Sequence, residues 1–467
     1  MKILCGSVKT RLPKPWTWRW RIFISFLIVL AIGVSVSSSQ TLVLKEEIDA
    51  PANVVHVADL NQDGKNEVLV GTTKIDRSSF VHIYSYSKDG YKKVWSYVIP
   101  EEGKRGGVSS ITTGDADNDG QIEIIMSTGK PSDAQGDSKL RIFDRPDGNS
   151  SLDAFEVSYS YDLTQKTDPG AIKVGDADND GKNEVLVGLS YYSGKILQFK
   201  HDPHTDDYQV STVQNTGSNV KTIDIADVND DGKNEVVAGT SCWKTYDVRV
   251  LEYKGVYKNS WNKIIGYTLA TTGNLNNDSK PEILAISGTH CGNMDTPQPR
   301  VWIFNCTSNF QGYSRYEEMW NESFESGKAF GQGGCYPVIG DLTGDEVNEF
   351  AFPMNINKTH KIVYVYSRIG GEFERLQTIE VTPSSLFIED SDNNGVNELL
   401  ICDNYDRKIK IYEKQEEQKK DKTASEKKNS AAPEAKEIAS ETSNLPGFEA
   451  VIALLGAAIA LITRKWR

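Results

Sequence analysis

Residues 59–67 read Asp-Leu-Asn-Gln-Asp-Gly-Lys-Asn-Glu, and residues 115–123 read Asp-Ala-Asp-Asn-Asp-Gly-Gln-Ile-Glu. Both segments place oxygen-bearing side chains at positions 1, 3 and 5, a glycine at position 6 and a glutamate at position 9. The pattern recurs along the chain in seven copies, of which five are complete and two are degraded. Because each copy marks one structural unit, this internal repeat decides the fold.

We number the copies loop 1 to loop 7 in chain order. Oxygen ligands at positions 1, 3 and 5 of a tight loop converge on one point, and glycine at position 6 permits the sharp turn. This spacing is typical of a site for a hard cation, and we expect calcium as the cofactor. The predicted ligands of the complete loops are Asp59, Asn61, Asp63 and Glu67; Asp115, Asp117, Asp119 and Glu123; Asp176, Asp178, Asp180 and Glu184; Asp227, Asn229, Asp231 and Glu235; and Asp390, Asp392, Asn394 and Glu398.

Loops 5 and 6 are degraded and are weaker metal candidates. Loop 5 keeps only two carboxylates, and in loop 6 Glu346 replaces the turn glycine. Their corresponding positions are Asn274, Asn276, Asp278 and Glu282 in loop 5, and Asp341, Thr343, Asp345 and Glu349 in loop 6. A set of Asx-turns that bind no ion is the alternative for all loops, and it stays open above all for these two.

The acidity of the chain comes from these loops. Positions 1, 3, 5 and 9 together hold 22 carboxylates, so that without them the net charge of −13 would be +9. Clusters of carboxylates repel one another unless a cation neutralises them, so bound metal should stabilise the fold. An acidic chain also lacks the basic face that nucleic-acid binding requires, and no nucleic-acid partner is expected.

Each loop lies between two short apolar runs, and two further runs follow before the next loop, so each unit is predicted to form four strands. Residues 41–413 shared among seven units give about 53 residues each, close to the repeat length of long-bladed propellers. The seventh unit ends near Tyr412 without a fourth strand, whereas Thr41 to Ile48 reads as an unassigned strand. The sequence therefore predicts an all-β, seven-bladed β-propeller over residues 40–412, whose last blade is closed by the N-terminal strand.

Both termini carry segments that predict targeting to the membrane. Residues 1–39 combine a basic start, an apolar stretch and a small polar exit, which predicts a signal peptide, with an uncleaved anchor as the alternative. Residues 413–444 are rich in charged and small residues and predict a disordered stalk. Residues 445–467 form an apolar segment with a basic end, which predicts a transmembrane or sorting segment. The body should therefore be displayed outside the cell.

The tripeptide Pro446-Gly447-Phe448, followed by the apolar run and the basic end, resembles the PGF-CTERM sorting tail of archaeal surface proteins. The resemblance implies processing by an archaeosortase-type enzyme and attachment to the membrane through a lipid. A plain C-terminal membrane anchor is the alternative.

The acidic loops resemble FG-GAP/VCBS repeats and are similar to the calcium-binding blades of integrin alpha-chain propellers over about 370 residues. The resemblance implies calcium loops on one face and ligand contacts on the opposite face. The resemblance supports the fold and the metal but not a particular function. We expect a surface-anchored binding or adhesion module for an extracellular glycan or protein. A calcium-dependent, lyase-like enzyme acting on polysaccharides and a structural envelope component are the alternatives, and no short catalytic motif is present.

The loops opposite the metal face supply the candidate ligand contacts. Aromatic and polar side chains in these loops suit sugars or peptides, although they also suit packing between blades. The candidates are Tyr191, Tyr192, Trp243, Tyr246 and His290.

Six cysteines are present, and Cys5 lies in the predicted signal peptide, which leaves an odd number in the body. Cys242 and Cys291 follow the second strands of adjacent units, so a bridge between them is the first candidate. A bridge between Cys306 and Cys335 is the second, and reduced cysteines are the alternative. The sequons at Asn149, Asn305, Asn321 and Asn357 are acceptor sites for N-linked glycans.

Overall fold

The computed structural model describes residues 41–72, 79–100, 107–129, 138–146, 148–163, 169–190, 194–242, 244–278, 280–288, 299–310, 313–324, 328–329, 335–356 and 361–415. The predicted signal peptide, nearly all of the predicted stalk and the C-terminal segment lie outside these residues. In the part of the chain that is described, no helix is both long and apolar enough to cross a membrane.

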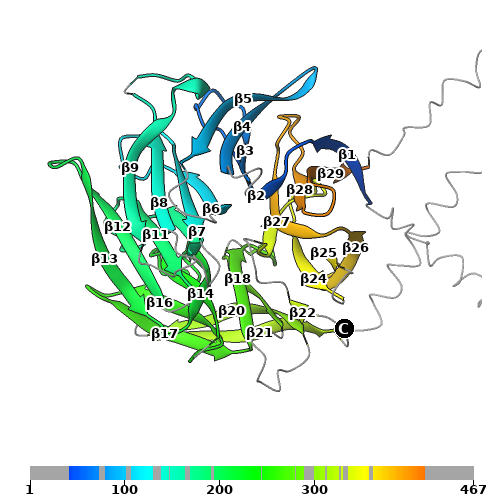
Figure 1. Cartoon of the computed structure of the whole chain (residues 1–467). Helices are drawn as coiled ribbons and strands as arrows, with labels where there is room; N and C mark the ends of the chain where they lie inside the picture. The colour runs from blue at the N-terminus through cyan, green and yellow to red at the C-terminus, as the bar shows by residue number, and fades with distance from the viewer. Residues whose placement is uncertain are drawn as a thin grey trace, which may run out of the picture. The chain divides into compact units, whose positions relative to one another are not determined.

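Seven antiparallel sheets form the blades of a β-propeller, with their first strands around the centre and their fourth strands at the periphery (Figure 1). Blade 1 contains β2 (Ala52–Ala58), β3 (Glu67–Thr72), β4 (Ser79–Ser87) and β5 (Gly90–Ile99). Blade 2 contains β6 (Gly107–Gly114), β7 (Glu123–Gly129), β8 (Ser138–Asp144) and β9 (Glu156–Leu163), with the short 3-10 helix η1 (Leu152–Ala154) before β9. Blade 3 contains β10 (Pro169–Gly175), β11 (Glu184–Leu189), β12 (Lys195–Asp202) and β13 (Asp207–Asn215).

The remaining blades follow the same order. Blade 4 contains β14 (Asn219–Ala226), β15 (Glu235–Ser241), β16 (Asp247–Tyr253) and β17 (Tyr257–Ile264). Blade 5 contains β18 (Tyr267–Gly273), β19 (Glu282–Gly288), β20 (Arg300–Phe310) and β21 (Tyr313–Ser323). In blade 6 two short strands, β22 (Lys328–Ala329) and β23 (Val338–Gly340), both pair with β24 (Glu349–Asn355), which is followed by β25 (Lys361–Ile369) and β26 (Glu372–Glu380). Blade 7 contains β27 (Pro383–Glu389), β28 (Glu398–Asp403), β29 (Lys408–Lys414) and β1 (Leu42–Ile48).

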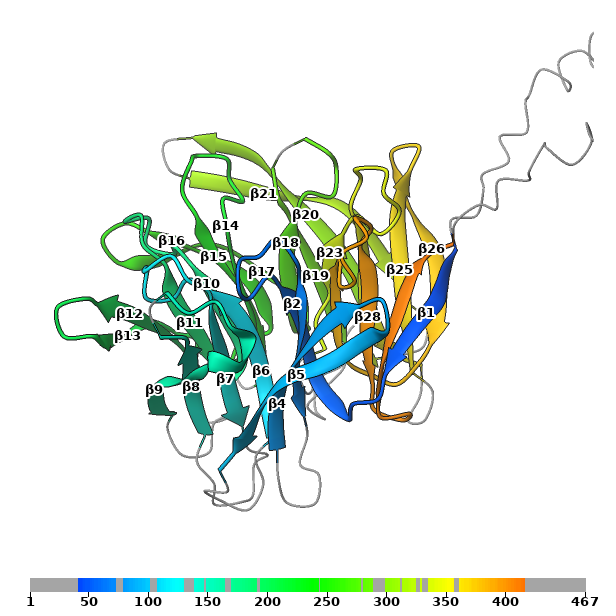
Figure 2. The same cartoon turned by 90° about the horizontal axis from the view of Figure 1, so that it is seen from above.

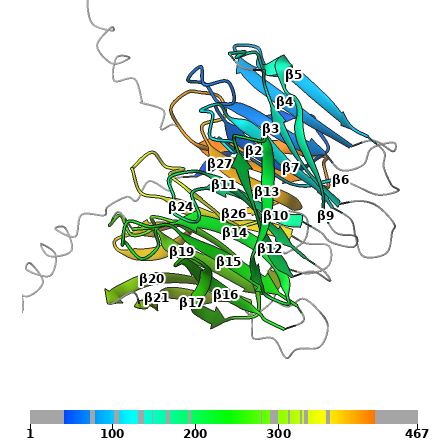
Figure 3. The ribbon, with the colours of Figure 1, turned by 90° about the vertical axis from the view of Figure 1, so that its left-hand side faces the viewer.

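The core lies between the blades, whose sheets pack face to face around the ring (Figures 2 and 3). Every residue of the second strands β3 and β11 is buried, as expected for strands covered on both faces. Neighbouring first strands approach closely, since a Cβ atom added at Gly114 would lie 2.7 Å from Cγ1 of Val174 in the next blade. The fourth strands β5 and β9 consist mostly of exposed and half-buried residues, which is typical of an outer strand.

The N-terminal strand closes the ring, as the sequence predicted. β1 pairs with β29, with Leu44 opposite Tyr412 and Ile48 opposite Ile409. Gln377 of blade 6 fixes the start of β1, because its side-chain oxygen accepts a hydrogen bond from Leu42 N at 2.8 Å and its amide donates to Leu42 O at 3.0 Å. The first and last strands of the propeller therefore share one sheet, which removes the exposed edge of β29.

Leu42→Ala should destabilise the propeller by about 2 kcal/mol or more, because it leaves a cavity where the N-terminal strand meets blades 6 and 7. Leu42 is 3% exposed, whereas Leu44 on the same strand is 47% exposed. Leu44→Ala is therefore the matched control, with an expected change below about 0.5 kcal/mol. Equal effects of the two variants in thermal unfolding would show that β1 does not close the ring.

Candidate metal centres

A buried glutamate ends each acidic loop and begins the second strand of its blade. In all seven loops its Oε2 atom accepts a hydrogen bond from the backbone N–H of loop position 2, which draws the start of the loop against the start of the strand. The pairs are Leu60 with Glu67, Ala116 with Glu123, Ala177 with Glu184, Val228 with Glu235, Leu275 with Glu282, Leu342 with Glu349 and Ser391 with Glu398. Each of these glutamates is at most 2% exposed.

The first and fifth positions form the turn that the sequence predicted. In loop 1, Oδ1 of Asp59 accepts a hydrogen bond from Asp63 N at 3.0 Å, and its Oδ2 accepts one from Gly64 N at 2.8 Å. Gly64 has a φ of 84°, a conformation that glycine adopts without strain. These bonds hold the loop in shape by themselves, so the case for a cation depends on the remaining oxygens of each loop.

Loop 2 fits a cation. Asp115, Asp117 and Glu123 each offer a carboxylate oxygen, and these atoms lie within 4.8 Å of one another. Oδ1 of Asp115 and Oε1 of Glu123 are buried and have no hydrogen-bond partner among the described residues. Burial and the nearby charges of Asp117, Asp144 and Asp119 raise the pKa of Glu123 to about 9. A divalent cation would supply the missing partner and offset the repulsion.

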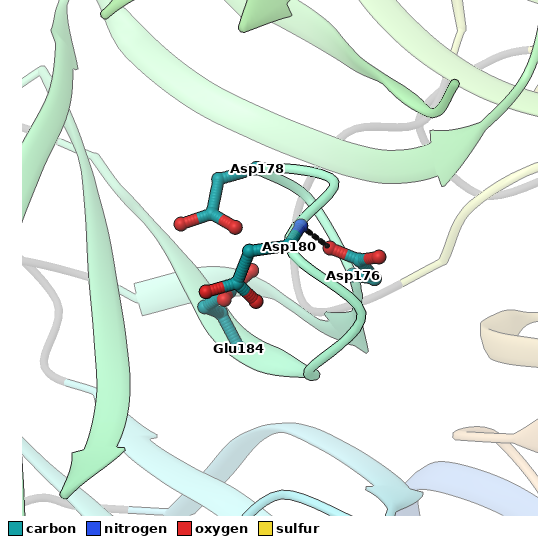
Figure 4. Close-up of side chains that lie close together, drawn as sticks. All are labelled: Asp176, Asp178, Asp180 and Glu184. Atoms are coloured by element: carbon teal, nitrogen blue, oxygen red, sulfur yellow. Dashed lines mark hydrogen bonds between the residues drawn. The ribbon is translucent and has the colours of Figure 1, made fainter. Parts of the chain in front are cut away.

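Loop 3 brings together Asp176, Asp178, Asp180 and Glu184, as Figure 4 shows, but a lysine already occupies the cluster. Nζ of Lys200, on β12, lies 2.9 Å from Oδ2 of Asp178 and 3.2 Å from Oε1 of Glu184, and it also contacts Asp180. Burial alone would lower the pKa of Lys200, but its hydrogen bonds to these carboxylates raise it. The ammonium group therefore stays charged.

Loop 7 shows the same arrangement with a different lysine. Nζ of Lys45, on β1, lies 2.5 Å from Oδ2 of Asp392, 3.2 Å from Oε1 of Glu398 and 2.8 Å from Oε1 of Glu413. Burial would lower the pKa of Lys45, but the hydrogen bonds to Asp392 and Glu413 raise it. The strand that closes the ring thus brings a positive charge to loop 7.

Within the described residues, side-chain amides and hydroxyls reach the acids in the other loops. Oε1 of the glutamate accepts from Asn229 at 2.8 Å in loop 4, from Asn276 at 2.7 Å in loop 5 and from Ser367 at 2.7 Å in loop 6. In loop 1, Asn61 donates to Asp63 at 3.3 Å. Among the described residues, groups of three or more acids that could hold a metal ion form in loops 2, 3 and 7.

Asparagines at loop positions 4 and 8 tie neighbouring loops together, a role that the sequence analysis missed. Asn118 of loop 2 accepts a hydrogen bond from Asn183 N at 2.7 Å, and the Asn183 side chain donates to Asp115 O at 2.8 Å. Equivalent or related contacts at the other junctions are Asn179 with Asn234, Asp230 with Lys280, Asn274 with Asn348, Asp341 with Asn397, Asn393 with Asn66, and Gln62 with Gly120. The recurrent Asn-Glu at positions 8 and 9 was the available signal.

The predicted ligand-face residues are mostly outside the described structure. Tyr191, Tyr192, Trp243 and His290 fall among the residues that are not described. Tyr246 is described and half-buried, and its backbone carbonyl accepts a hydrogen bond from Ile265 N at 2.9 Å. The role of these five residues in binding stays a prediction.

The cysteines follow the sequence prediction only in part. Cys242 is disulfide-bonded, and its predicted partner Cys291 lies outside the described residues. Cys306 and Cys335 are both free and buried, so the predicted bridge between them is wrong. The reason is that Cys306 is buried in the core between blades 4 and 5, whereas Cys335 is buried in the core between blades 6 and 7.

The metal-free protein should lose stability as pH rises. Burial is the main cause that raises the pKa of Glu67, Glu123 and Glu235 from 4.5 to about 7, 9 and 8, respectively. These pKa values are higher in the folded than in the unfolded chain. The stability that the three protonated glutamates contribute is therefore fully present below pH 4.5 and is lost as pH rises towards 9. Melting temperatures measured in chelator should show this decline, and Glu123→Gln should reduce its slope. An unchanged slope in this variant would contradict the assignment.

Glu346→Gly should stabilise loop 6. Glu346 has a φ of 66° at the position where complete loops carry glycine, and a non-glycine residue in this conformation costs about 1 kcal/mol. Gly395→Ala in loop 7 is the reverse control, because an added Cβ at Gly395 meets nothing within 4 Å and would test backbone strain alone. Chemical denaturation should give changes of opposite sign for the two variants.

A comparison with known protein families agrees with the repeat architecture. Residues 55–126, which hold loops 1 and 2, match the family described as FG-GAP-like repeat. Among solved structures, rhamnogalacturonan lyase YesW is similar, with 13% sequence identity, a TM-score of 0.46 and coverage of 80% of this chain and 76% of that chain. The protein is therefore a seven-bladed β-propeller that contains an FG-GAP-like repeat.

Proposed function

We propose that this protein is an exported, cell-surface-anchored, calcium-binding β-propeller that binds an extracellular glycan or protein ligand. The observation that carries the proposal is that the two faces of the propeller differ, since the acidic loops lie on one of them. The acidic loops form hydrogen bonds with one another around one face, so the side chains of that face serve to hold the propeller together. In antiparallel blades the connections between second and third strands emerge on the opposite face, which is left for the ligand.

An exposed aromatic residue on that opposite face supports a binding role. Tyr405 lies in the turn between β28 and β29, and it is 84% exposed, more than any other large apolar side chain among the described residues. An exposed tyrosine offers both a flat apolar ring and a hydroxyl group, which suits stacking against a sugar or a peptide. The sequence analysis missed Tyr405 because its turn is short.

The central channel contains an ion pair. Its lining surrounds about 180 Å³ and includes Lys173 and Asp224, whose Nζ and Oδ1 atoms lie 2.7 Å apart. The charge of Asp224 raises the pKa of Lys173, so this lysine stays protonated and is unsuited to act as a base. Burial and the charge of Lys173 lower the pKa of His56 to about 3, so this histidine stays neutral.

Export and anchoring are supported by the terminal segments and by cysteine chemistry. The apolar stretch after the basic start and the apolar run near the end are the features that predict secretion and attachment. The disulfide of Cys242 adds support, because disulfides persist mainly in oxidising compartments outside the cytosol. The archaeosortase-type processing and the lipid anchor belong to the same proposal.

The test incubates the purified full chain with a panel of polysaccharides and glycoproteins, with calcium and with chelator. We expect calcium-dependent retention of the protein without release of new polysaccharide ends. Tyr405→Ala should weaken retention, whereas Val256→Ala is the control, because Val256 is exposed in the turn between β16 and β17, on the acidic-loop face. Release of new ends would instead support a polysaccharide-acting enzyme. Absence of both retention and release would favour a structural envelope component.

A further inference from the structure

One register position distinguishes the seven acidic loops from one another. In each blade, the third strand places one side chain opposite the glutamate that ends the loop, as Ser85 lies opposite Glu67 in blade 1. Extending the strand pairings of the other blades by one residue gives the equivalent residues Asp144, Lys200, Glu252, Asn305, Ser367 and Glu413. The loop motifs are alike, but this position carries a negative, neutral or positive side chain.

In blade 3 the residue at this position is a lysine that uses the whole acidic cluster. An ammonium group has three N–H donors, and Lys200 meets three different carboxylates. The fourth carboxylate, that of Asp176, accepts hydrogen bonds from Asp180 N and Gly181 N, each at 3.0 Å. A calcium ion needs the same oxygens at 2.3–2.6 Å, so it could enter only after the lysine left.

In blade 7 the positive charge comes from another strand. The register position holds Glu413, which adds an acid to the cluster, and Lys45 of β1 contacts Asp392, Glu398 and Glu413 together. The lysine side chain is 24% exposed, while those of Asp392 and Glu398 are 5% and 0% exposed. The N-terminal strand therefore delivers a cation to loop 7 when it closes the ring.

Blade 2 provides the contrast. No lysine contact is found in its cluster among the described residues, and the register position holds a further acid, Asp144. Oε1 of Glu184 in loop 3 and Oε1 of Glu123 in loop 2 both lack a hydrogen-bond partner among the described residues. Nζ of Lys200 lies 3.2 Å from Oε1 of Glu184, whereas no ion pair reaches Oε1 of Glu123 in the described part of the chain. Loops 2 and 3 have identical acids at all four ligand positions, so the cross-strand residue is what separates them.

We propose that Lys200 and Lys45 act as built-in cations that take the place of calcium in blades 3 and 7, so that these two loops exclude the metal while loop 2 requires it. The inference rests on the metal-binding part of the proposed function and sets its selectivity among blades. According to this proposal, the acidic loop motif by itself does not predict a bound metal. Calcium withdrawal should consequently loosen blade 2 first, while blades 3 and 7 keep their charge balance.

The first experiment counts calcium ions bound to the purified full chain by native mass spectrometry and isothermal titration. Asp117→Asn in loop 2 should lose one calcium per chain, whereas the matched Asp178→Asn in loop 3 should lose none. Loss of one calcium in Asp178→Asn would overturn the proposal, because it would show that loop 3 holds the metal despite Lys200. Absence of calcium from the wild type would contradict the proposed function, and the next variants would still test the lysines.

The second experiment removes the lysines. Lys200→Met should gain one bound calcium per chain, and its melting temperature should become more dependent on calcium than that of the wild type. Lys195→Met is the control, since Lys195 lies at the other end of β12 and should change neither quantity. Lys45→Met should likewise gain one calcium. Folded Lys200→Met and Lys45→Met proteins with unchanged calcium counts would reject the role of these lysines. If a lysine variant fails to fold, Asp178→Asn decides the case for loop 3 and Asp392→Asn decides it for loop 7, since loss of one calcium in either would overturn the proposal for that loop.

Discussion

The structure depends on a carboxylate buried at the start of the second strand of every blade. Its Oε2 atom holds the acidic loop in place through the N–H of loop position 2, and this bond recurs even in loops 5 and 6, whose other ligand positions have degraded. Burial of a carboxylate is costly unless its second oxygen also finds a partner. The blades differ in which group meets this second oxygen, whereas the geometry of the loop follows from the bond that they share.

The blades solve this problem in different ways. Lysines meet the glutamate in blades 3 and 7, and amide or hydroxyl groups meet it in blades 4, 5 and 6. In blade 2 the second oxygen has no partner among the described residues, which leaves a place for a cation. Under the proposal made above, a single repeat motif would support both metal-binding and metal-independent blades.

Contacts between loops join these separate solutions into one ring. Side chains at positions 4 and 8 connect every neighbouring pair of loops, and β1 completes the circle of sheets at blade 7. A displacement of one loop would therefore disturb hydrogen bonds of its neighbour, because the Asn183 side chain donates to a backbone carbonyl of the preceding loop. In the proposed function, these contacts hold the acidic-loop face in place while the opposite face presents Tyr405 to a ligand.

The sequence by itself determined the repeat, the number of blades, the turn geometry and the closing strand, because these features follow from local spacing and from strand length. It also placed the ligand positions of the loops, since positions 1, 3, 5 and 9 lie within nine residues. Only the tertiary structure decided how each acidic cluster is neutralised. Lys200 lies across a strand pair from Glu184, and Lys45 comes from the other end of the described sequence to Asp392 in the same blade, so no local pattern records either contact. The free Cys306 and Cys335 make the same point, because disulfide pairing depends on which blades bring two thiols together.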